Sequence, residues 1–181
     1  MIIYVHGFAS SGMGVKAQLF RTFYKDEEEG FIAPSLSYIP DLAIKTLEEM
    51  IEAYDGEIKL IGSSLGGYYS LYLSQKYGLK AVLINPSIFP YKTLKGSQGS
   101  MIHYHDGSKF EWNQEHFEAL REYEARDVDD TKILLLLQTG DESLDYKEAL
   151  KKLPNATHIV EEGGNHSFEN IERHFKLIKN F

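Results

Sequence analysis

Short apolar runs, separated for the most part by segments long enough to form a helix, dominate this sequence. The runs are rich in Ile, Val and Leu and most stop near Gly, Pro or Asn, as strands buried on both faces of a sheet do. They cover residues 2–5, 31–36, 57–61, 81–84, 133–137 and 157–160. Strands that alternate with helices predict parallel βαβ units, and therefore an α/β fold with helices on both faces of one sheet.

Helical spacing of apolar residues marks most of the segments between these runs. Helices are expected over residues 44–54, 68–77, 111–126, 144–153 and 168–178. Asp41, after Pro40, is the expected cap of the first of them, and Pro34 leaves the end of the second strand open. No repeat, linker or low-complexity tract divides the 181 residues, so residues 1–181 are expected to form a single domain.

Composition narrows the classes of partner. A net charge of −8 argues against a general nucleic-acid or anionic-membrane binder. The absence of cysteine removes disulfides, thiolate metal ligands and a cysteine nucleophile. No apolar run approaches the roughly 18–20 residues of a membrane span, and the first residues lack the features of a signal peptide. A cytoplasmic location is expected, and composition leaves the oligomeric state open.

The segment after the third run has the pattern of a nucleophile elbow. Residues 62–66 read "GSSLG", which fits G-x-S-x-G, the strand-to-helix turn that presents a nucleophilic serine. The pattern has only a few fixed letters, and Gly and Ser also collect in ordinary turns. Ser64 is the expected nucleophile, and Ser63, at the variable position, is the weaker alternative.

The ends of other runs carry the remaining groups of a serine hydrolase. Acyl transfer through serine needs a base, a group that orients the base, and N–H donors for the oxyanion. Asp141 follows the fifth run, His166 follows the sixth, and Phe8 follows the first. Ligands bind at the carboxyl ends of parallel strands, so these groups are expected to meet. The backbone N–H groups of Phe8 and Leu65 are the expected oxyanion donors.

Longer stretches resemble a known family. The stretches are "IIYVHGFASS", "LIGSSLGGYYS", "INPS", "LLQTGDESLDY" and "GGNHSF". On these, the chain resembles the α/β-hydrolases, whose triad order Ser, Asp, His it shares, and is similar to the small YqiA-like esterases. The resemblance implies a minimal six-stranded parallel sheet of order 2-1-3-4-5-6, without the two antiparallel strands that open larger members.

The same resemblance implies the roles of the site residues. Ser64 is the implied nucleophile, His166 the base and Asp141 the orienting acid, with Asp145 as the alternative acid. The implied reaction is hydrolysis of carboxylic esters or acyl-thioesters through an acyl-enzyme on Ser64, without a cofactor. A small-molecule ester or thioester is therefore the expected partner, while the acyl chain and the leaving group stay open.

Residues 86–130, between the fourth and fifth runs, break the alternation. No strand is expected there; the first half is loop-like and residues 111–126 favour a charged helix. So long a connection is usually functional or disordered. Its aromatic residues Tyr91, Phe110 and Trp112 have two interpretations. They either wall an acyl pocket above Ser64 within a lid, or anchor a long loop to the core.

Other functions are compatible with the same residues. Peptidases and acyltransferases use the same triad, and a hydrolase fold can also persist as a silent binding protein, although the intact Ser, Asp and His argue against that. His103 and His105 form an H-x-H pair. Because no third ligand stands at a metal-binding spacing, they are interpreted as surface histidines and no metal is expected.

Overall fold

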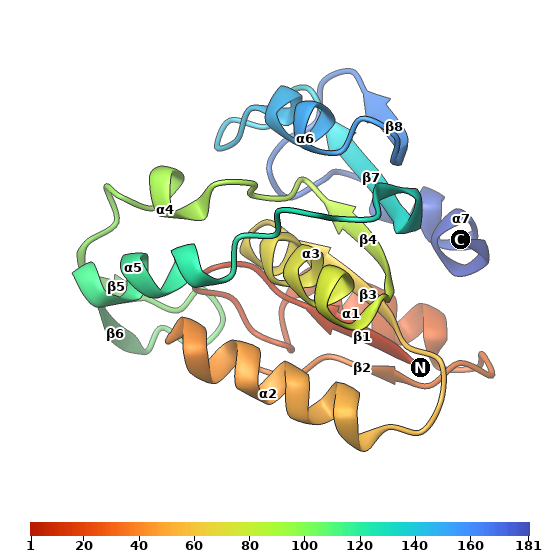
Figure 1. The fold of residues 1–181 in the computed structure, drawn as a ribbon, viewed down its shortest axis with the longest axis horizontal. Coiled ribbons are helices and arrows are strands. Elements are labelled where there is room, and N and C mark those ends of the chain that lie inside the picture. Colours follow the sequence, from red (N-terminus) through yellow and green to blue (C-terminus); the bar gives the residue numbers. More distant parts are fainter.

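A single parallel sheet forms the centre of the chain in the computed structural model, which describes residues 1–181 (Figure 1). Its strands are β1 (Ile2–Val5), β2 (Phe31–Ile32), β3 (Lys59–Ser63), β4 (Lys80–Ile84), β7 (Ile133–Gln138) and β8 (Thr157–Glu161). The order is β2-β1-β3-β4-β7-β8 and every pair is parallel. Numbered within this sheet alone, the order is 2-1-3-4-5-6, so the predicted fold class and strand order are confirmed.

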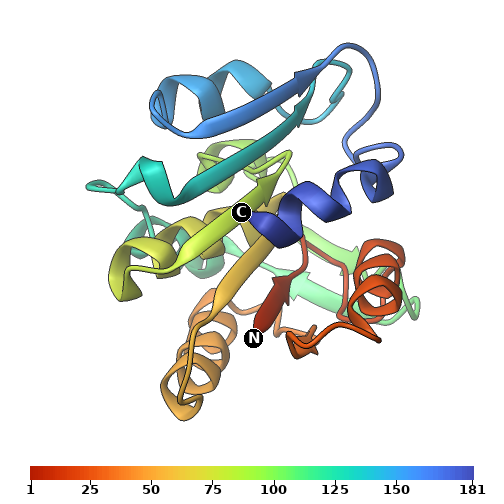
Figure 2. The ribbon, with the colours of Figure 1, turned by 90° about the vertical axis from the view of Figure 1, so that its right-hand side faces the viewer.

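Helices cover both faces of the sheet (Figure 2). The helices are α1 (Val15–Tyr24), α2 (Pro40–Ala53), α3 (Leu65–Tyr77), α4 (Pro90–Thr93), α5 (Gln114–Glu122), α6 (Tyr146–Lys152) and α7 (Phe175–Asn180), with 3-10 turns η1 (Asp130–Lys132) and η2 (Ile171–His174). Successive strand side chains point to opposite faces. Ile3 and Val5 of β1 join the larger core of 30 buried residues with α2, α3, α5 and α6, while Ile2 and Tyr4 join the smaller core with α1 and α7.

The second strand is shorter than predicted. The prediction extended to residue 36, but β2 contains only Phe31 and Ile32. Pro34 has no N–H to donate to a ladder, and the N–H of Leu36 donates instead to Nε2 of His6 at 2.9 Å. The chain leaves the sheet at this point and crosses toward the first strand's carboxyl end.

Two helix starts also differ from the predictions. Pro40 is the first residue of α2, where its missing N–H costs nothing, so Asp41 lies in the first turn and is not the cap. The C-terminal helical segment begins at Ile171, later than predicted, because Phe168 and Asn170 have left-handed backbone angles, with φ of 62° and 55°.

The insert, residues 86–130, contains strands that the sequence did not predict. β5 (Gly99–Ile102) and β6 (Lys109–Trp112) form an antiparallel hairpin, and helix α5 starts only at Gln114, after the cap Asn113. The expectation of no strand is therefore wrong, because these strands are short and β6 alternates polar and apolar residues, without a continuous apolar run.

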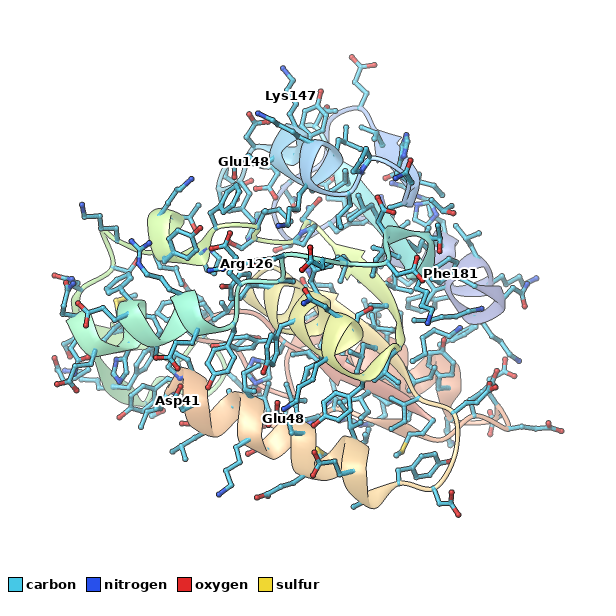
Figure 3. The ribbon with its side chains drawn as sticks, in the orientation of Figure 1. Asp41, Glu48, Arg126, Lys147, Glu148 and Phe181 are labelled. Atoms are coloured by element: carbon cyan, nitrogen blue, oxygen red, sulfur yellow. The ribbon has the colours of Figure 1, made fainter.

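The hairpin and helix α5 of the insert lie at one end of the molecule, at the left in Figure 1. Helix α5 lies against the start of α2, where Tyr123 Oη donates to Oδ1 of Asp41 at 2.7 Å; Figure 3 shows Asp41 at that end of α2. No helix anywhere in the chain combines the length and the apolarity that crossing a bilayer requires.

Candidate active site

Ser64 stands in a sharp turn between β3 and α3. Its backbone angles, φ of 55° and ψ of −120°, are rarely adopted by residues other than glycine. A Cβ at Gly62 would collide with the carbonyl oxygen of Gly66, and a Cβ at Gly66 with that of Val5. The turn closes only because both flanking residues lack a side chain, as in a nucleophile elbow. Such strain is characteristic of functional sites.

Three side chains from three strand ends form one hydrogen-bonded line. Oγ of Ser64 lies 3.0 Å from Nε2 of His166. Nδ1 of His166 lies 2.8 Å and 3.0 Å from the two carboxylate oxygens of Asp141. A carboxylate only accepts, so Nδ1 carries the proton and Nε2 is free to accept from the serine hydroxyl.

Asp141 is held in place by its own loop. The N–H groups of Ser143 and Leu144 each donate to Oδ1 of Asp141 at 2.9 Å. Burial alone would raise the pKa of Asp141. The hydrogen bonds from His166, Ser143 and Leu144 together lower it by more than burial raises it, so the pKa of Asp141 lies below its usual value. The group is therefore a carboxylate at neutral pH.

Asp145, the alternative acid, has a different position. Its Oδ1 accepts from the N–H of Lys147 at 3.0 Å, and it is the N-cap of α6. The structure brings Asp141, and not Asp145, to His166.

The loop that carries His166 is positioned by two buried amides that the sequence did not single out. Asn85, at the end of β4, donates through Nδ2 to the carbonyls of Asn165 and His166 at 3.0 and 3.3 Å. Gln138, at the end of β7, accepts through Oε1 from the N–H groups of Asn165 and Glu169 at 3.2 and 2.9 Å.

The side chain of Asn85 also links the ends of β4 and β7. Oδ1 of Asn85 accepts from the N–H of Gln138 at 3.0 Å. Both side chains are almost fully buried, with 2% and 1% exposed, and buried amides of this kind are rarely left without partners. A polar residue closing an otherwise apolar strand, as both do, is the sequence signal that marks them.

The loop after β1 passes beside the serine. A Cβ at Gly7 would lie 3.2 Å from Cβ of Ser64. His6 fixes this loop: its Nδ1 donates to the carbonyl of Gly7 at 2.8 Å, and its Nε2 accepts from Leu36. Burial lowers the pKa of His6, which keeps the ring neutral and both bonds intact. No hydrogen bond within the chain uses the N–H of Phe8 or of Leu65 as donor, so both remain available to a ligand.

A cavity of about 1190 Å³ opens above Ser64. Phe8, Leu65 and His166 line it beside the serine. One wall comes from α1 and the loop before it, with Val15, Lys16 and Leu19, and another from the insert, with Pro90, Leu94 and Met101. The volume lies slightly above the range usual for small-molecule sites, about 300–1,000 Å³.

The three predicted pocket residues lie away from this cavity, so that interpretation is wrong. None of Tyr91, Phe110 and Trp112 lines it. The alternation of β6 turns Phe110 and Trp112 inward together, and their rings pack against Phe8 with centroids 5.7 and 4.9 Å apart. Tyr91 Oη donates to Glu124 at 3.0 Å. Phe110 and Trp112 thus anchor the insert to the loop of Phe8, and Tyr91 is buried in the larger core.

The two histidines of the H-x-H pair have separate surroundings. The His103 ring lies against Phe110, with centroids 4.5 Å apart, and His105 borders the cavity. No group of three or more His, Asp or Glu side chains is arranged to hold a metal ion.

Comparison with known proteins gives one family and one fold. The family described as "Uncharacterised protein family (UPF0227)" matches residues 1–181. A UPF0227 protein of Citrobacter koseri is 28% identical over 187 residues, covering 100% of this chain and 98% of the relative. UPF0227 protein YcfP of Escherichia coli has the same identity and coverage.

Solved structures with the same architecture include hydrolases. Mouse alpha/beta hydrolase domain-containing protein 10 superimposes with a TM-score of 0.74 at 18% identity, covering 99% of this chain and 86% of that one. Est1E of Butyrivibrio proteoclasticus, with ferulic acid bound, gives 0.69 at 15% identity, covering 99% and 86%. A monoacylglycerol lipase of Paleococcus ferrophilus gives 0.71 at 15%, covering 98% and 92%. The chain has the α/β-hydrolase fold.

Proposed function

The chain belongs to the UPF0227 family, and from its site we propose that it is a serine hydrolase that cleaves carboxylic esters or acyl-thioesters. The observation that carries the proposal is the unbroken hydrogen-bonded line from Ser64 Oγ through His166 to Asp141, at 3.0 and 2.8 Å. Ser64, at one end of this line, borders a cavity large enough for a small-molecule substrate.

Acylation begins with the serine proton. Nε2 of His166 takes the proton from Oγ of Ser64 while Oγ bonds to the carbonyl carbon of the substrate, and the C=O electron pair moves onto oxygen. The N–H groups of Phe8 and Leu65 donate to this oxyanion. The tetrahedral intermediate then collapses: the bond to the alcohol or thiol breaks, and the leaving group takes the proton from His166.

Deacylation repeats these steps with water. His166 Nε2 removes a proton from a water molecule while the water oxygen bonds to the acyl carbon. The second tetrahedral intermediate then breaks its bond to Oγ of Ser64, which takes the proton back from His166 as the carboxylic acid leaves. Throughout, Asp141 holds the ring with Nδ1 protonated and stabilises the imidazolium. Its lowered pKa suits that role, since a protonated acid would stabilise it far less.

The other activities compatible with the fold make different demands. A peptidase or acyltransferase would use the same triad on a different acceptor or bond. A silent binding protein would not need the Ser64–His166–Asp141 line or two free N–H donors beside the serine. The intact line favours catalysis. Ester cleavage through an acyl-enzyme requires no catalytic group beyond this line and the two N–H donors.

Reaction with a fluorophosphonate probe tests the proposal directly. We expect one probe adduct per chain, located at Ser64 by mass spectrometry, with Ser64→Ala unlabelled and Ser63→Ala labelled as in the natural chain. A panel of chromogenic esters, acyl-thioesters and peptide anilides then ranks the substrate classes. A chain that takes up no probe and hydrolyses none of the panel would contradict the proposal and favour a silent binding protein.

A further inference from the structure

Lys16 places a positive charge in the wall of the active-site cavity. It is the second residue of α1, and its Nζ donates to the carbonyl of Ser167 at 2.7 Å, one residue after His166. Among the residues that line the cavity it is the sole lysine or arginine.

The charge of Lys16 is not neutralised by a partner. No carboxylate forms an ion pair with it, and its one hydrogen-bond acceptor is a neutral carbonyl. An ammonium group has three N–H donors, so two remain for a ligand. Burial lowers the pKa of Lys16 to about 8, although the charge of Asp141 acts in the opposite direction. The group is therefore largely protonated at pH 7.

The position of Lys16 indicates which part of a substrate it meets. His166 Nε2 hands its proton to the leaving group, so the leaving group lies on the His166 side of the scissile bond. Lys16 contacts the loop of His166, whereas Pro90, Leu94 and Met101 supply the insert wall of the cavity. The cation thus borders the space of the leaving group.

We propose that Lys16 makes the cavity selective for esters or thioesters whose leaving group carries an anionic group, such as a carboxylate or a phosphate. This inference rests on the proposed function, because it defines a substrate class for the same serine. Charge-assisted hydrogen bonds contribute about 1.5–3 kcal/mol, which corresponds to about 10–100-fold in rate.

Two matched thioesters test the proposal. The S-butyryl thioesters of 3-mercaptopropionate and of 3-mercaptopropionamide differ in one charge and hardly in shape. Hydrolysis of both is followed by thiol release with a disulfide reagent, to which this chain contributes no background because it has no cysteine. The quantity compared is the ratio of kcat/KM for the anionic and the neutral thioester.

We expect a ratio of about 10–100 for the natural chain at pH 7. In Lys16→Met the ratio should fall to about 1. Lys25→Met, which removes an exposed charge at the far end of α1, should keep the natural ratio. Lys16→Arg should retain a preference for the anion.

The pH dependence adds a readout that a purely structural lysine would not move. Lys16 is charged below its pKa of about 8, so the natural ratio should decline between pH 7 and pH 9. In Lys16→Arg it should not, because a guanidinium stays protonated. His105, His166 and Glu172 line the same cavity, and the charge of Asp141 acts on Lys16. Lys16→Arg leaves all four groups unchanged, so a decline seen in the natural chain and absent from Lys16→Arg belongs to Lys16.

Three results would count against these ideas, and they are distinguishable. A natural ratio near 1, with both thioesters hydrolysed, would overturn the role of Lys16 alone. So would a Lys16→Met variant that hydrolyses both thioesters more slowly at an unchanged ratio, because Lys16 would then only hold the Ser167 carbonyl. Failure to hydrolyse either thioester, without probe adduct on Ser64, would overturn the proposed function and this inference with it.

Discussion

The sheet edge that carries the triad and the insert of residues 86–130 border the same cavity but are built by different means. At the sheet edge, the register of parallel strands brings Ser64, Asp141 and His166 together, and glycines and buried amides shape the loops. In the insert, a two-stranded hairpin outside the main sheet is held by ring packing. Backbone topology thus positions the reactive groups, and side-chain packing shapes the space around them.

The two regions meet at the loop after β1. Phe8 lines the cavity, and its ring packs against Trp112 of the insert. The N–H of Tyr104 in the hairpin donates to the carbonyl of Ala9 at 2.8 Å. The hairpin is therefore fastened to the loop that we propose forms half of the oxyanion site. We propose that the insert caps the cavity from this fastened position, with Leu94 and Met101 as its contribution.

The largest effect is expected at the sheet edge. Ser64→Ala should lower ester kcat by about 10⁴–10⁶-fold, since loss of the nucleophile leaves only binding and the oxyanion donors. Ser63→Ala, one residue earlier and buried in the end of β3, should stay within about tenfold of the natural rate. Steady-state hydrolysis of a chromogenic ester measures both. If Ser63→Ala is the inactive variant and Ser64→Ala keeps its activity, the nucleophile is Ser63 and not Ser64.

Asp141→Asn should have the next largest effect, about 10³–10⁴-fold in kcat, because an amide beside Nδ1 favours the wrong imidazole tautomer. Asp145→Asn is the matched control. Asparagine caps a helix about as well as aspartate, so this variant should keep its rate and its free energy of unfolding. Equal losses of activity in the two variants, or a larger loss in Asp145→Asn, would assign the role of the orienting acid to Asp145.

The sheet edge was largely predictable from the sequence because its residues follow recognisable strands. Ser64, Asp141 and His166 each stand a few residues after an apolar run, and parallel strands must end at one edge. The geometry separates Asp141 from Asp145 through hydrogen bonds that no spacing contains. The pocket residues were not predictable, because whether Phe110 faces the cavity or the core depends on the register of a hairpin that lacks an apolar run.

The buried amides test whether the sheet edge depends on more than strand order. Gln138→Met keeps the length of the side chain but leaves the N–H groups of Asn165 and Glu169 without their acceptor. We expect kcat to fall about 10–100-fold with little change in KM, since the variant disturbs the position of His166 and not the substrate pocket. The rate of Ser64 labelling by the fluorophosphonate probe should fall in parallel.

Gln75→Met is the control for this variant. Gln75 also accepts two backbone N–H bonds through Oε1, from Arg126 and Asp127, but far along α3 from the site. It should leave kcat and the labelling rate unchanged. Loss of stability without loss of labelling rate in Gln138→Met would reduce Gln138 to a structural residue.

The smallest expected effect concerns acyl selectivity in the insert, where neighbouring residues of β5 make a matched pair. Met101 lines the cavity, whereas Ile102 is 53% exposed and does not. Met101→Ala should enlarge the acyl space and shift the preferred chain length upward. Each added methylene contributes up to about 0.8 kcal/mol, or about fourfold in kcat/KM, until the space is filled. Ile102→Ala should leave the chain-length profile unchanged.

Trp112→Ala separates packing from selectivity within the same hairpin. Its side chain is 1% exposed and packs on Phe8 and Phe117, so its loss should lower the free energy of unfolding by about 3–5 kcal/mol. Because Trp112 does not line the cavity, the order of preferred acyl lengths should persist in the folded fraction. If the chain-length profile shifts in Trp112→Ala and not in Met101→Ala, the inward face of the hairpin sets acyl selectivity. Selectivity could then no longer be assigned to the residues that line the cavity and stability to those that pack inside the insert.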